Sequence, residues 1–386
     1  MNAVIVNTRM NLIHFITSIP TKLILKRLRS SGYSSYSASI LLDKWYEDIF
    51  SNKKTTITQK IWAHKRGFFS DRIAYLGLTD QNFTDYLSDF DYFWLHPING
   101  AYGYWIDDKL TIKYILQPFG EYLPEYYYHV YNGEILRLMD CPDGYGQTTR
   151  EVINLLKAKG VLAAKLVSGS GGEGFYKLAH EDHGYFVNNL PSNEEEVQEL
   201  IGTWLEKNKE EYLITEYIFE HREMQKIYKE APGTLRILVT RERLQSPGIL
   251  FAKHFFPTRK TGLTTNGKTV ACNVDICTGC FSDGITFVDS RVIDCKYHPD
   301  TNVLLEGTLP NWGLISEKIV EICKSIPQVR YMGFDMIITN DGFKIIEINS
   351  FPGIGVNQHY CPHLKEDTSK YFYNNLFKEK KAVYKG

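Results

Sequence analysis

The stretch SGSGGEG at residues 168–174 lies between two short apolar segments and limits what this chain can fold into. Glycine weakens regular helices and strands, so four glycines in this stretch indicate a tight turn or a close approach of the backbone to a ligand. Gly169, Gly171 and Gly174 match G-x-G-x-x-G, but a Rossmann turn needs a helix directly afterwards, and GFYKLA and GYFVNN look like strands. A P-loop is excluded because Phe175 stands where its lysine belongs.

The remaining interpretation is a hairpin of two strands joined by a glycine loop. Such a loop can fold over nucleotide phosphates and offer backbone N–H groups to their oxygens. Lys165 lies on the preceding strand, AAKLV, where its ammonium could meet phosphate charge. The alternative is a surface hairpin without a ligand.

The chain changes character near residue 100. Residues 1–100 are predicted to be mostly helical, because LLDKWYEDIF and FTDYLSDFDYFW place apolar residues three and four positions apart. From GAYGYWIDDKLTIKYIL onward, helices mix with short strands such as TLRILVT, GILFAKHFF and KTVACNV. This mixture predicts an α+β fold with antiparallel sheets, and 386 residues are enough for two or three packed units.

A second hairpin is predicted at GFDMIITNDGFKIIEIN. Strand alternation puts Glu347 and Asn349 on one face, with Ile346 and Ile348 on the other. A two-residue Asp-Gly loop would pair Asp335 with Ile348, whereas a three-residue loop ending in glycine pairs Asp335 with Glu347. The second register gathers two carboxylates and an amide oxygen, which suit Mg²⁺ held against triphosphate oxygens. The alternative is a solvent-facing hairpin with ordinary polar residues.

Charge and hydropathy exclude two classes of function. The net charge of −1 gives the whole molecule no polycation character for nucleic acid. Each stretch of eighteen residues contains Asp, Glu, Lys or Arg, which excludes an ordinary membrane-spanning helix. The N-terminal segment NLIHFITSIPTKLILKRLRSS is a poor signal peptide. A core helix with a basic end is favoured there, and an amphipathic helix in peripheral contact with a membrane is the alternative.

The seven cysteines fit reduced thiols in a cytoplasmic protein better than a disulfide framework. Cys272, Cys277 and Cys280 have the C-x4-C-x2-C spacing of plant-type iron–sulfur proteins, with Cys295 as a fourth candidate ligand. However, VACNVDICTGC alternates like a strand with a turn at Thr278-Gly279, and strand cysteines behave as small apolar side chains. We therefore expect these cysteines to bind no metal.

In chain order, these segments resemble the ATP-grasp superfamily, and within it the sugar-transfer-associated ATP-grasp proteins of polysaccharide loci, over roughly residues 90–360. IDDKLTIKYIL resembles the start of the helix that bears the first phosphate-binding lysine, here Lys109, and Lys165 follows as the second. LITEYIFEH resembles the hinge whose backbone holds adenine. GTLRILVT resembles the segment whose arginine, here Arg236, faces the transferred phosphoryl group, and GFDMIITNDGFKIIEIN is the closest match.

The resemblance implies an ATP-grasp fold with a particular set of site residues. Its domains would be a helical N-terminal region at 1–100, a small subdomain with a glycine-rich lid at 101–215, and a large subdomain with the metal site at 216–375. The catalytic residues would be Arg236 and Lys165, the metal ligands Asp335, Glu347 and Asn349, and the cofactor-binding residues Lys109, Lys165, Ser168, Gly169, Ser170, Gly171, Gly172, Gly174, Glu216, Tyr217 and Ile218. Gly233 departs from the family, which often has asparagine there. Residues 1–100 also do not suggest the Rossmann-like domain with which ATP-grasp enzymes commonly open.

The family's chemistry is the ATP-dependent joining of a carboxylate to an amine through an acyl phosphate. The resemblance therefore implies a ligase that uses ATP and Mg²⁺. Its sugar-transfer members suggest that an amino acid or amino sugar is joined to a uronic acid, free or glycan-linked, in capsule or other surface-polysaccharide biosynthesis. A phosphotransferase acting on a sugar hydroxyl and a non-catalytic nucleotide-binding scaffold are the alternatives, and the intact set of ligands and lysines speaks against the scaffold.

Overall fold

The computed structural model describes residues 21–169, 171–182, 184–207, 210–242, 246–265, 269–288 and 291–384. The chain divides into two compact units. The first combines Met1–Gly100 with Gly353–Gly386, and the second is Ala101–Pro352. The C-terminal segment therefore belongs to the same unit as the N-terminal region.

The described part of the first unit is helical, which confirms the prediction for the N-terminal region. Residues 21–30 form a helix, whereas residues 11–20 of the segment considered for membrane contact lie outside the described residues. Some of these helices begin where a side-chain oxygen accepts a backbone N–H, as Ser34 does from Ser37. The elements are α2 (Ser35–Tyr46), η1 (Glu47–Ser51), α3 (Ile57–His64), α4 (Arg72–Leu76), η2 (Phe83–Asp85), α5 (Asp89–Leu95), α12 (Gly355–Tyr360) and α13 (Asp367–Tyr384).

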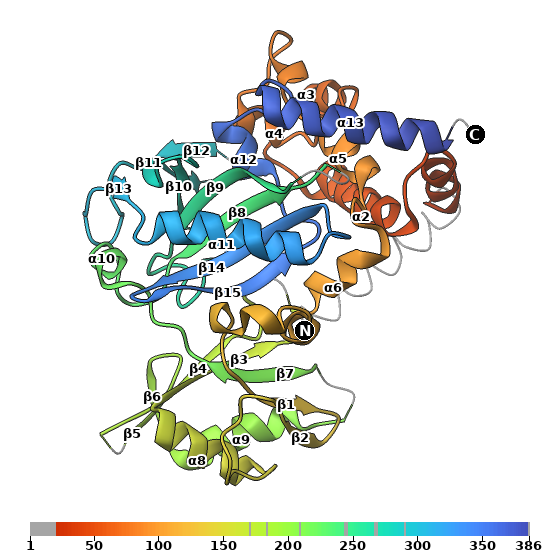
Figure 1. Ribbon diagram of the computed structural model, residues 1–386. Helices are drawn as coiled ribbons and strands as arrows, with labels where there is room; N and C mark the ends of the chain where they lie inside the picture. The colour runs from red at the N-terminus through yellow and green to blue at the C-terminus, as the bar shows by residue number, and fades with distance from the viewer. Residues whose placement is uncertain are drawn as a thin grey trace. The chain divides into compact units, whose positions relative to one another are not determined.

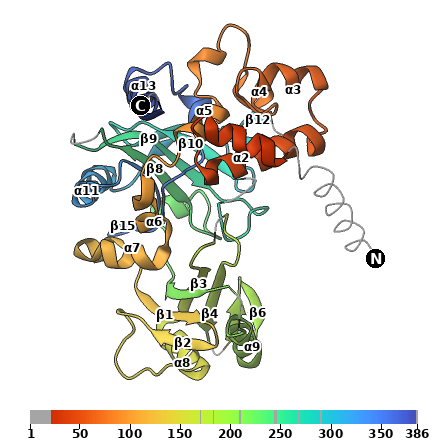
Figure 2. The same cartoon turned by 90° about the vertical axis from the view of Figure 1, so that its right-hand side faces the viewer.

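Contacts between distant segments hold the first unit together. Helix α2 packs beside α5, and α3 packs beside α4 (Figure 2). Gln358 in α12 accepts the Leu87 N–H at 2.7 Å and donates to the Leu87 carbonyl at 2.9 Å. These paired bonds satisfy a buried amide and fix α12 against the N-terminal helices.

The second unit contains two sheets. Among the described residues, seven strands form the first, in the order β2-β1-β7-β3-β4-β5-β6. Helices α8 (Thr149–Lys159) and α9 (Glu194–Trp204) cover one face of it, and Leu155, Leu162 and Ile201 lie in the core between them (Figure 1). The strands are β1 (Tyr126–Tyr131), β2 (Glu134–Arg137), β3 (Val161–Leu166), β4 (Tyr176–Glu181), β5 (Gly184–Val187), β6 (Leu190–Ser192) and β7 (Tyr212–Glu216).

The second sheet has eight strands among the described residues, in the order β12-β11-β10-β9-β8-β14-β15, with β13 paired to β11. Helix α11 (Trp312–Ser325) packs on one face, where Ile315 and Ile319 meet Ile237 and Phe334 in a single core. The strands are β8 (Thr234–Thr240), β9 (Gly248–Phe256), β10 (Val270–Val274), β11 (Cys280–Val288), β12 (Arg291–Asp294), β13 (Gly307–Thr308), β14 (Tyr331–Thr339) and β15 (Gly342–Asn349). Since α11 buries one face, alternate side chains point to the other.

Short helices connect these sheets. They are η3 (Gly100–Gly103), α6 (Tyr104–Asp107), α7 (Lys109–Ile115), η4 (Gln117–Tyr122) and α10 (Arg222–Gln225). All strand pairs with a described register are antiparallel, which confirms the predicted α+β class. No helix in the described ranges is long and apolar enough to cross a membrane.

Candidate active site

The β14–β15 hairpin places Asp335 opposite Glu347, as predicted, but by a different route. The three-residue loop is wrong: Thr339 pairs with Gly342, so only Asn340 and Asp341 form the turn. The register then shifts by one residue between Asp335 and Met336, which moves Glu347 into line with Asp335. A β-bulge rather than the loop length therefore creates this pairing.

The bulge also corrects the prediction for the isoleucines of β15. Met336 pairs with Ile345 and Asp335 with Glu347, so Ile346 is the extra residue. Ile345 and Ile348 lie in the core under α11, whereas Ile346 is only partly buried and lies outside that cluster. A bulge resets side-chain alternation, so Ile346 does not share the core face with Ile348 as predicted.

A row of polar side chains crosses the large sheet on the face opposite α11. Cα register connects each member to the next, one strand at a time. Their sequence neighbours, such as Phe334 and Ala252, lie in the core, so alternation directs the row to the other face. The members of this polar row are Glu347 in β15, Asp335 in β14, Arg236 in β8, Lys253 in β9 and Asn273 in β10.

Arg236 and Asp335 form a bidentate ion pair at the centre of the polar row. Arg236 Nε lies 2.6 Å from Asp335 Oδ1, and its Nη2 lies 2.6 Å from Oδ2. Asp335 is only 7% exposed, and Asn349 Nδ2 donates to its Oδ2 at 3.4 Å. A carboxylate this buried requires a counter-charge, which Arg236 supplies here.

Lys109 is the first residue of α7, as the sequence predicts. Asp108 caps this helix by accepting the Thr111 N–H at 2.6 Å, which fixes where the helix begins. Lys109 is 8% exposed, donates from Nζ to the Gly169 carbonyl at 2.8 Å, and lies 3.6 Å from Glu347 Oε2. It thus connects the glycine loop to a candidate metal ligand.

Lys165 faces the same region from β3. Its Nζ donates to the carbonyl oxygen of Ile346, the bulged residue, at 3.5 Å. Burial and the nearby ammonium of Lys109 lower the pKa of Lys165 to about 7, and the carboxylate of Glu347 opposes that shift. Near neutral pH, Lys165 is therefore only partly protonated, and an arriving anion would favour its charged form.

The chemistry of Asp335, Glu347 and Asn349 fits a Mg²⁺ site. Two carboxylates and an amide supply the oxygen ligands that this ion prefers. Each carboxylate lies beside a cationic side chain, Asp335 beside Arg236 and Glu347 beside Lys109. The negative charge of the two carboxylates is therefore stabilised by positive charge at this position. Within the described ranges, no three His, Cys, Asp or Glu side chains lie close enough to hold a metal, and this set depends on the asparagine as its third member.

The predicted hairpin around the glycine loop is confirmed, because β3 and β4 pair as antiparallel neighbours on either side of it. Ser168 and Gly169 follow β3, Gly171 and Gly172 have φ of 68° and 73°, and Ser170 lies outside the described residues. Gly174 has a φ of 66°, and a Cβ there would come within 2.6 Å of Leu166 Cγ. Glycine at this position satisfies both a left-handed backbone and close packing.

The predicted hinge begins where β7 ends at Glu216. The Glu216 N–H donates to the Glu125 carbonyl at 2.8 Å, so it is already engaged. Tyr217 and Ile218 follow and are buried, at 8% and 5% exposure. An adenine bound at this hinge would therefore use the backbone of Tyr217 and Ile218 rather than the Glu216 N–H.

Lys253 is a polar-row member that the sequence analysis did not single out. It is 2% exposed, and burial with the neighbouring charge of Arg236 lowers the pKa of Lys253 well below its usual range. A signal was present, because Lys253 stands at a period-two position within the apolar strand FAKHFF. Only the register with β8 shows that this position meets Arg236.

Two more lysines near the hinge were not predicted from the sequence. Lys344 Nζ donates to the Leu123 carbonyl at 3.0 Å and lies 3.7 Å from a carboxylate oxygen of Glu216. Lys177 Nζ lies 5.1 Å from the centre of the Tyr217 ring. These contacts join residues far apart in sequence, so no local pattern indicates them.

Packing explains why glycine stands at position 233, where the family often has asparagine. A Cβ there would lie 2.4 Å from His254 Cε1 and 2.7 Å from Glu220 Oε1. Burial raises the pKa of Glu220 to about 8 and lowers the pKa of His254 to about 3, so burial favours the uncharged form of each side chain. The Gly233 N–H donates to Glu220 Oε1 at 3.0 Å. A larger residue at position 233 would disrupt this buried pair.

The four clustered cysteines are only partly in strands. Cys272 lies in β10 and Cys280 opens β11, whereas Cys277 and Cys295 lie outside strands, so alternation placed two of the four wrongly. The predicted turn is present, with Gly279 at a φ of 74°. All seven cysteines are free thiols.

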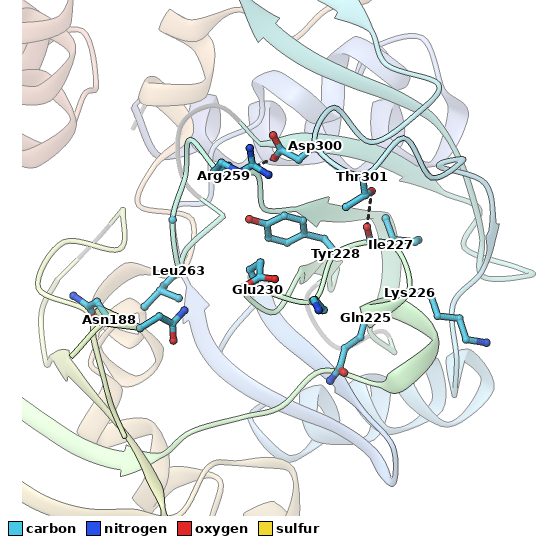
Figure 3. Close-up of a pocket in the computed structure, with 13 residues that line it drawn as sticks. Asn188, Gln225, Lys226, Ile227, Tyr228, Glu230, Arg259, Leu263, Asp300 and Thr301 are labelled. Atoms are coloured by element: carbon cyan, nitrogen blue, oxygen red, sulfur yellow. Dashed lines mark hydrogen bonds between the residues drawn. The ribbon is translucent and has the colours of Figure 1, made fainter. Parts of the chain in front are cut away.

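A cavity of about 490 Å³ lies beside the turn between β5 and β6 (Figure 3). Figure 3 shows the Tyr228 ring with the Glu230 side chain beneath it. The Thr301 hydroxyl donates to the Ile227 carbonyl at 2.8 Å. Amides, a phenol and charges of both signs line the cavity: Asn188, Asn189, Gln225, Tyr228, Glu230, Arg259 and Asp300. Such a lining suits a polar, hydroxylated ligand.

Comparison with solved structures returns ATP-utilising ligases and carboxylases at low identity. The D-alanine–D-alanine ligase from Bacillus anthracis complexed with ATP is 15% identical, with 73% of this chain and 68% of that chain covered and a TM-score of 0.38. Biotin carboxylase from Campylobacter jejuni is 12% identical, with coverages of 71% and 46% and a TM-score of 0.41. D-alanyl-alanine synthetase A from Vibrio cholerae is 11% identical, with coverages of 73% and 66% and a TM-score of 0.42.

No curated protein matches the chain significantly. A family model does: the one described as sugar-transfer associated ATP-grasp matches residues 80–366. That range includes the glycine loop, the hinge, the β8 arginine and the β14–β15 hairpin, and it extends over most of the sequence. The chain therefore belongs to the sugar-transfer associated ATP-grasp family, and its predicted fold class is confirmed.

Proposed function

We propose that this protein is an ATP-dependent carboxylate–amine ligase that acts through an acyl phosphate. One observation carries the proposal: Lys109, Arg236, Asp335 and Glu347 come from four separate elements yet form two adjacent ion pairs, one between β8 and β14 and one between helix α7 and β15. Such alternating charge suits a reaction in which a polyanionic phosphate meets a carboxylate. A surface hairpin with ordinary polar residues would leave these side chains exposed, whereas Lys109 and Asp335 are buried.

In this proposal, Lys109 and Lys165 contact the ATP phosphates, and the backbone of residues 168–174 covers them as a lid. The hinge at Tyr217 and Ile218 holds the adenine. Mg²⁺, when held by Asp335, Glu347 and Asn349, supplies further neutralisation of phosphate charge. In this proposal the small subdomain is 101–215 and the large subdomain is 216–375, of which residues 353–375 group with the first unit.

The reaction has two steps. A carboxylate oxygen of the first substrate attacks the γ-phosphorus of ATP, and the bond from that phosphorus to ADP breaks. An amine then attacks the acyl carbon, its nitrogen loses a proton to solvent, the amide bond forms, and inorganic phosphate leaves with the electron pair of the broken C–O bond. The Arg236 guanidinium, which can bridge two oxygens, stabilises the transferring phosphoryl group.

We further propose that an amino acid or amino sugar is joined to a uronic acid, free or glycan-linked, in capsule or other surface-polysaccharide biosynthesis. The family description and the polar cavity beside Tyr228 support a hydroxylated substrate. A cytoplasmic location with reduced thiols is part of the proposal. Peripheral membrane contact through the N-terminal segment would bring the enzyme to a lipid-linked glycan.

Hydroxylamine distinguishes this ligase from a phosphotransferase. It converts an acyl phosphate into a hydroxamate but does not react with a phosphate monoester. The enzyme is incubated with ATP, Mg²⁺, hydroxylamine and a panel of uronic acids, and both ADP and hydroxamate are measured. Hydroxamate formed in step with ADP supports the ligase.

Two other outcomes contradict the proposal. ADP release with a phosphorylated sugar and no hydroxamate indicates a phosphotransferase that acts on a sugar hydroxyl. Nucleotide binding without turnover, for every acid and amine in the panel, indicates a non-catalytic scaffold.

A further inference from the structure

Lys253 is a buried lysine on the same sheet face as the candidate metal ligands. It is 2% exposed and lies in the middle of β9, where its neighbours Ala252 and His254 point to the opposite face. Register pairs it with Arg236 on one side and with Asn273 on the other. The position is therefore fixed by two strands rather than by a flexible loop.

Among the described residues, the side chain of Lys253 makes no hydrogen bond and no ion pair, and its backbone belongs to the ladders of β9 with β8 and β10. The nearest carboxylate of the polar row, Asp335, is one strand farther away and binds Arg236 through both oxygens. A buried lysine side chain whose amino group has no hydrogen-bond partner lowers stability, so a structural role does not account for it. A side chain of this kind is typical of a site that binds an anion.

Asn273 completes the pair on the outer side of Lys253. Its side chain is partly exposed, lies on the same face, and has no hydrogen-bond partner among the described residues. An ammonium and an amide N–H₂ one strand apart can together donate to two oxygens of one carboxylate.

We propose that Lys253 and Asn273 bind the reacting carboxylate of the first substrate, on the side of Arg236 away from the metal ligands. The proposal rests on the ligase function above and gives the acceptor acid a place on the sheet. Lys253 is then a substrate-binding residue, separate from the lysines that contact ATP.

The order of the polar row supports this assignment. Neighbouring strands lie about 4.8 Å apart, so Asp335, Arg236 and Lys253 follow one another at that spacing. Displacement at phosphorus requires the attacking oxygen and the leaving ADP oxygen on opposite sides of the transferred group. With phosphates held near Asp335 and the phosphoryl group at Arg236, the next position along the row belongs to the attacking carboxylate.

The reverse of the first step tests this without knowledge of the natural acid. Acetyl phosphate and MgADP are supplied, the bond from phosphorus to the acyl oxygen breaks, a bond from phosphorus to the β-phosphate oxygen of ADP forms, and acetate and ATP are released. ATP is measured by luminescence in the wild type and in Lys253→Met, Lys253→Arg and Lys318→Met. Lys318 is the matched control, because it lies on α11 and pairs with Glu321 at 2.7 Å.

For Lys253→Met, we expect the KM for acetyl phosphate to rise about tenfold to a hundredfold, as for loss of a hydrogen bond to a charged group. The KM for ADP should change by less than about twofold, because ADP lies on the other side of Arg236. Lys253→Arg should recover part of the lost affinity, and Lys318→Met should behave as wild type. The melting temperature of Lys253→Met should rise, since a buried polar group without a side-chain partner is replaced by an apolar one.

Two results overturn the inference alone. One is an unchanged KM for acetyl phosphate in Lys253→Met, and the other is an equal loss for acetyl phosphate and ADP with a lower melting temperature, which indicates a structural role. If hydroxamate forms in the forward assay but acetyl phosphate is not used, the same variants are compared by their KM for the acid that forms hydroxamate. If neither assay gives product, the ligase proposal itself fails, and this inference fails with it.

Discussion

The pKa of Lys165 leads to a quantitative prediction for nucleotide binding. Lysine normally titrates near 10.5, whereas burial and Lys109 lower the pKa of Lys165 to about 7. Phosphate oxygens beside the ammonium would favour its charged form and raise that pKa again. Above pH 7, the free protein must therefore take up a proton to bind ADP with full strength, whereas below pH 7 the proton is already present.

The size of the effect follows from proton linkage. If the pKa in the complex returns towards 10.5, ADP affinity is constant below pH 7 and falls up to tenfold per pH unit above it. Between pH 7.5 and 9.0, the dissociation constant should rise about 25-fold, which corresponds to about 1.9 kcal/mol. The β-phosphate of ADP is already ionised across this range, so its own titration adds little.

Isothermal titration calorimetry of ADP with EDTA measures this directly. At pH 8.5, titrations in buffers with different ionisation enthalpies should report close to one proton taken up per ADP. Lys165→Arg is the matched control, because arginine stays charged throughout the range and should remove both the pH dependence and the proton uptake. A dissociation constant that stays flat, or an equal slope in Lys165→Arg, would refute the role of Lys165 in phosphate binding.

Four other predictions test separate parts of the site. Glu347→Gln should abolish ATP-dependent turnover at saturating Mg²⁺ with a near-native fold by circular dichroism, and unchanged ADP release would argue against Glu347 as a metal ligand. Amide hydrogen exchange at residues 171–174 should slow when ATP and Mg²⁺ are added, and equal protection with and without nucleotide would remove the lid role. Arg236→Lys should raise the activation free energy of turnover by about 3–4 kcal/mol and weaken ATP binding much less, since lysine cannot bridge two oxygens. Equal losses in turnover and in ATP affinity would contradict a role of Arg236 in phosphoryl transfer. Gly233→Ala should destabilise the fold by about 1–3 kcal/mol in thermal unfolding, because its methyl group overlaps His254 and Glu220.

The sequence predicts a structural feature most accurately where that feature depends on residues close together in the chain. The glycine loop between β3 and β4, the start of α7 at Lys109 and the helical N-terminal region depend on residues within a few positions of one another. The pairing of Asp335 with Glu347 was also predicted, but from a loop that does not exist. Alternation assumes an unbroken strand, so it cannot reveal a bulge such as that at Ile346.

What the sequence could not reveal depends on contacts between distant segments. The ion pair of Lys109 with Glu347 and the position of Lys253 beside Arg236 both require the order of strands in the sheet. The grouping of residues 353–386 with the first unit is another example. The sequence of an amphipathic helix such as α13 does not indicate which other segment the helix packs against. The subdomain boundaries at 101–215 and 216–375 stay proposals.

The ion pairs of the site also link its ligands to one another. Asp335 is held by Arg236, and Glu347 lies beside Lys109, so each of the two candidate carboxylate ligands shares its cation with the phosphate-binding or transfer machinery. Phosphates that attract Lys109 would draw it from Glu347 and leave that carboxylate with a need for positive charge, which a divalent cation can meet. The same argument applies to Arg236, which can reach a transferring phosphoryl group only by loosening its bidentate contact with Asp335. Nucleotide and metal should therefore each strengthen the binding of the other, because each releases the partner that the other requires.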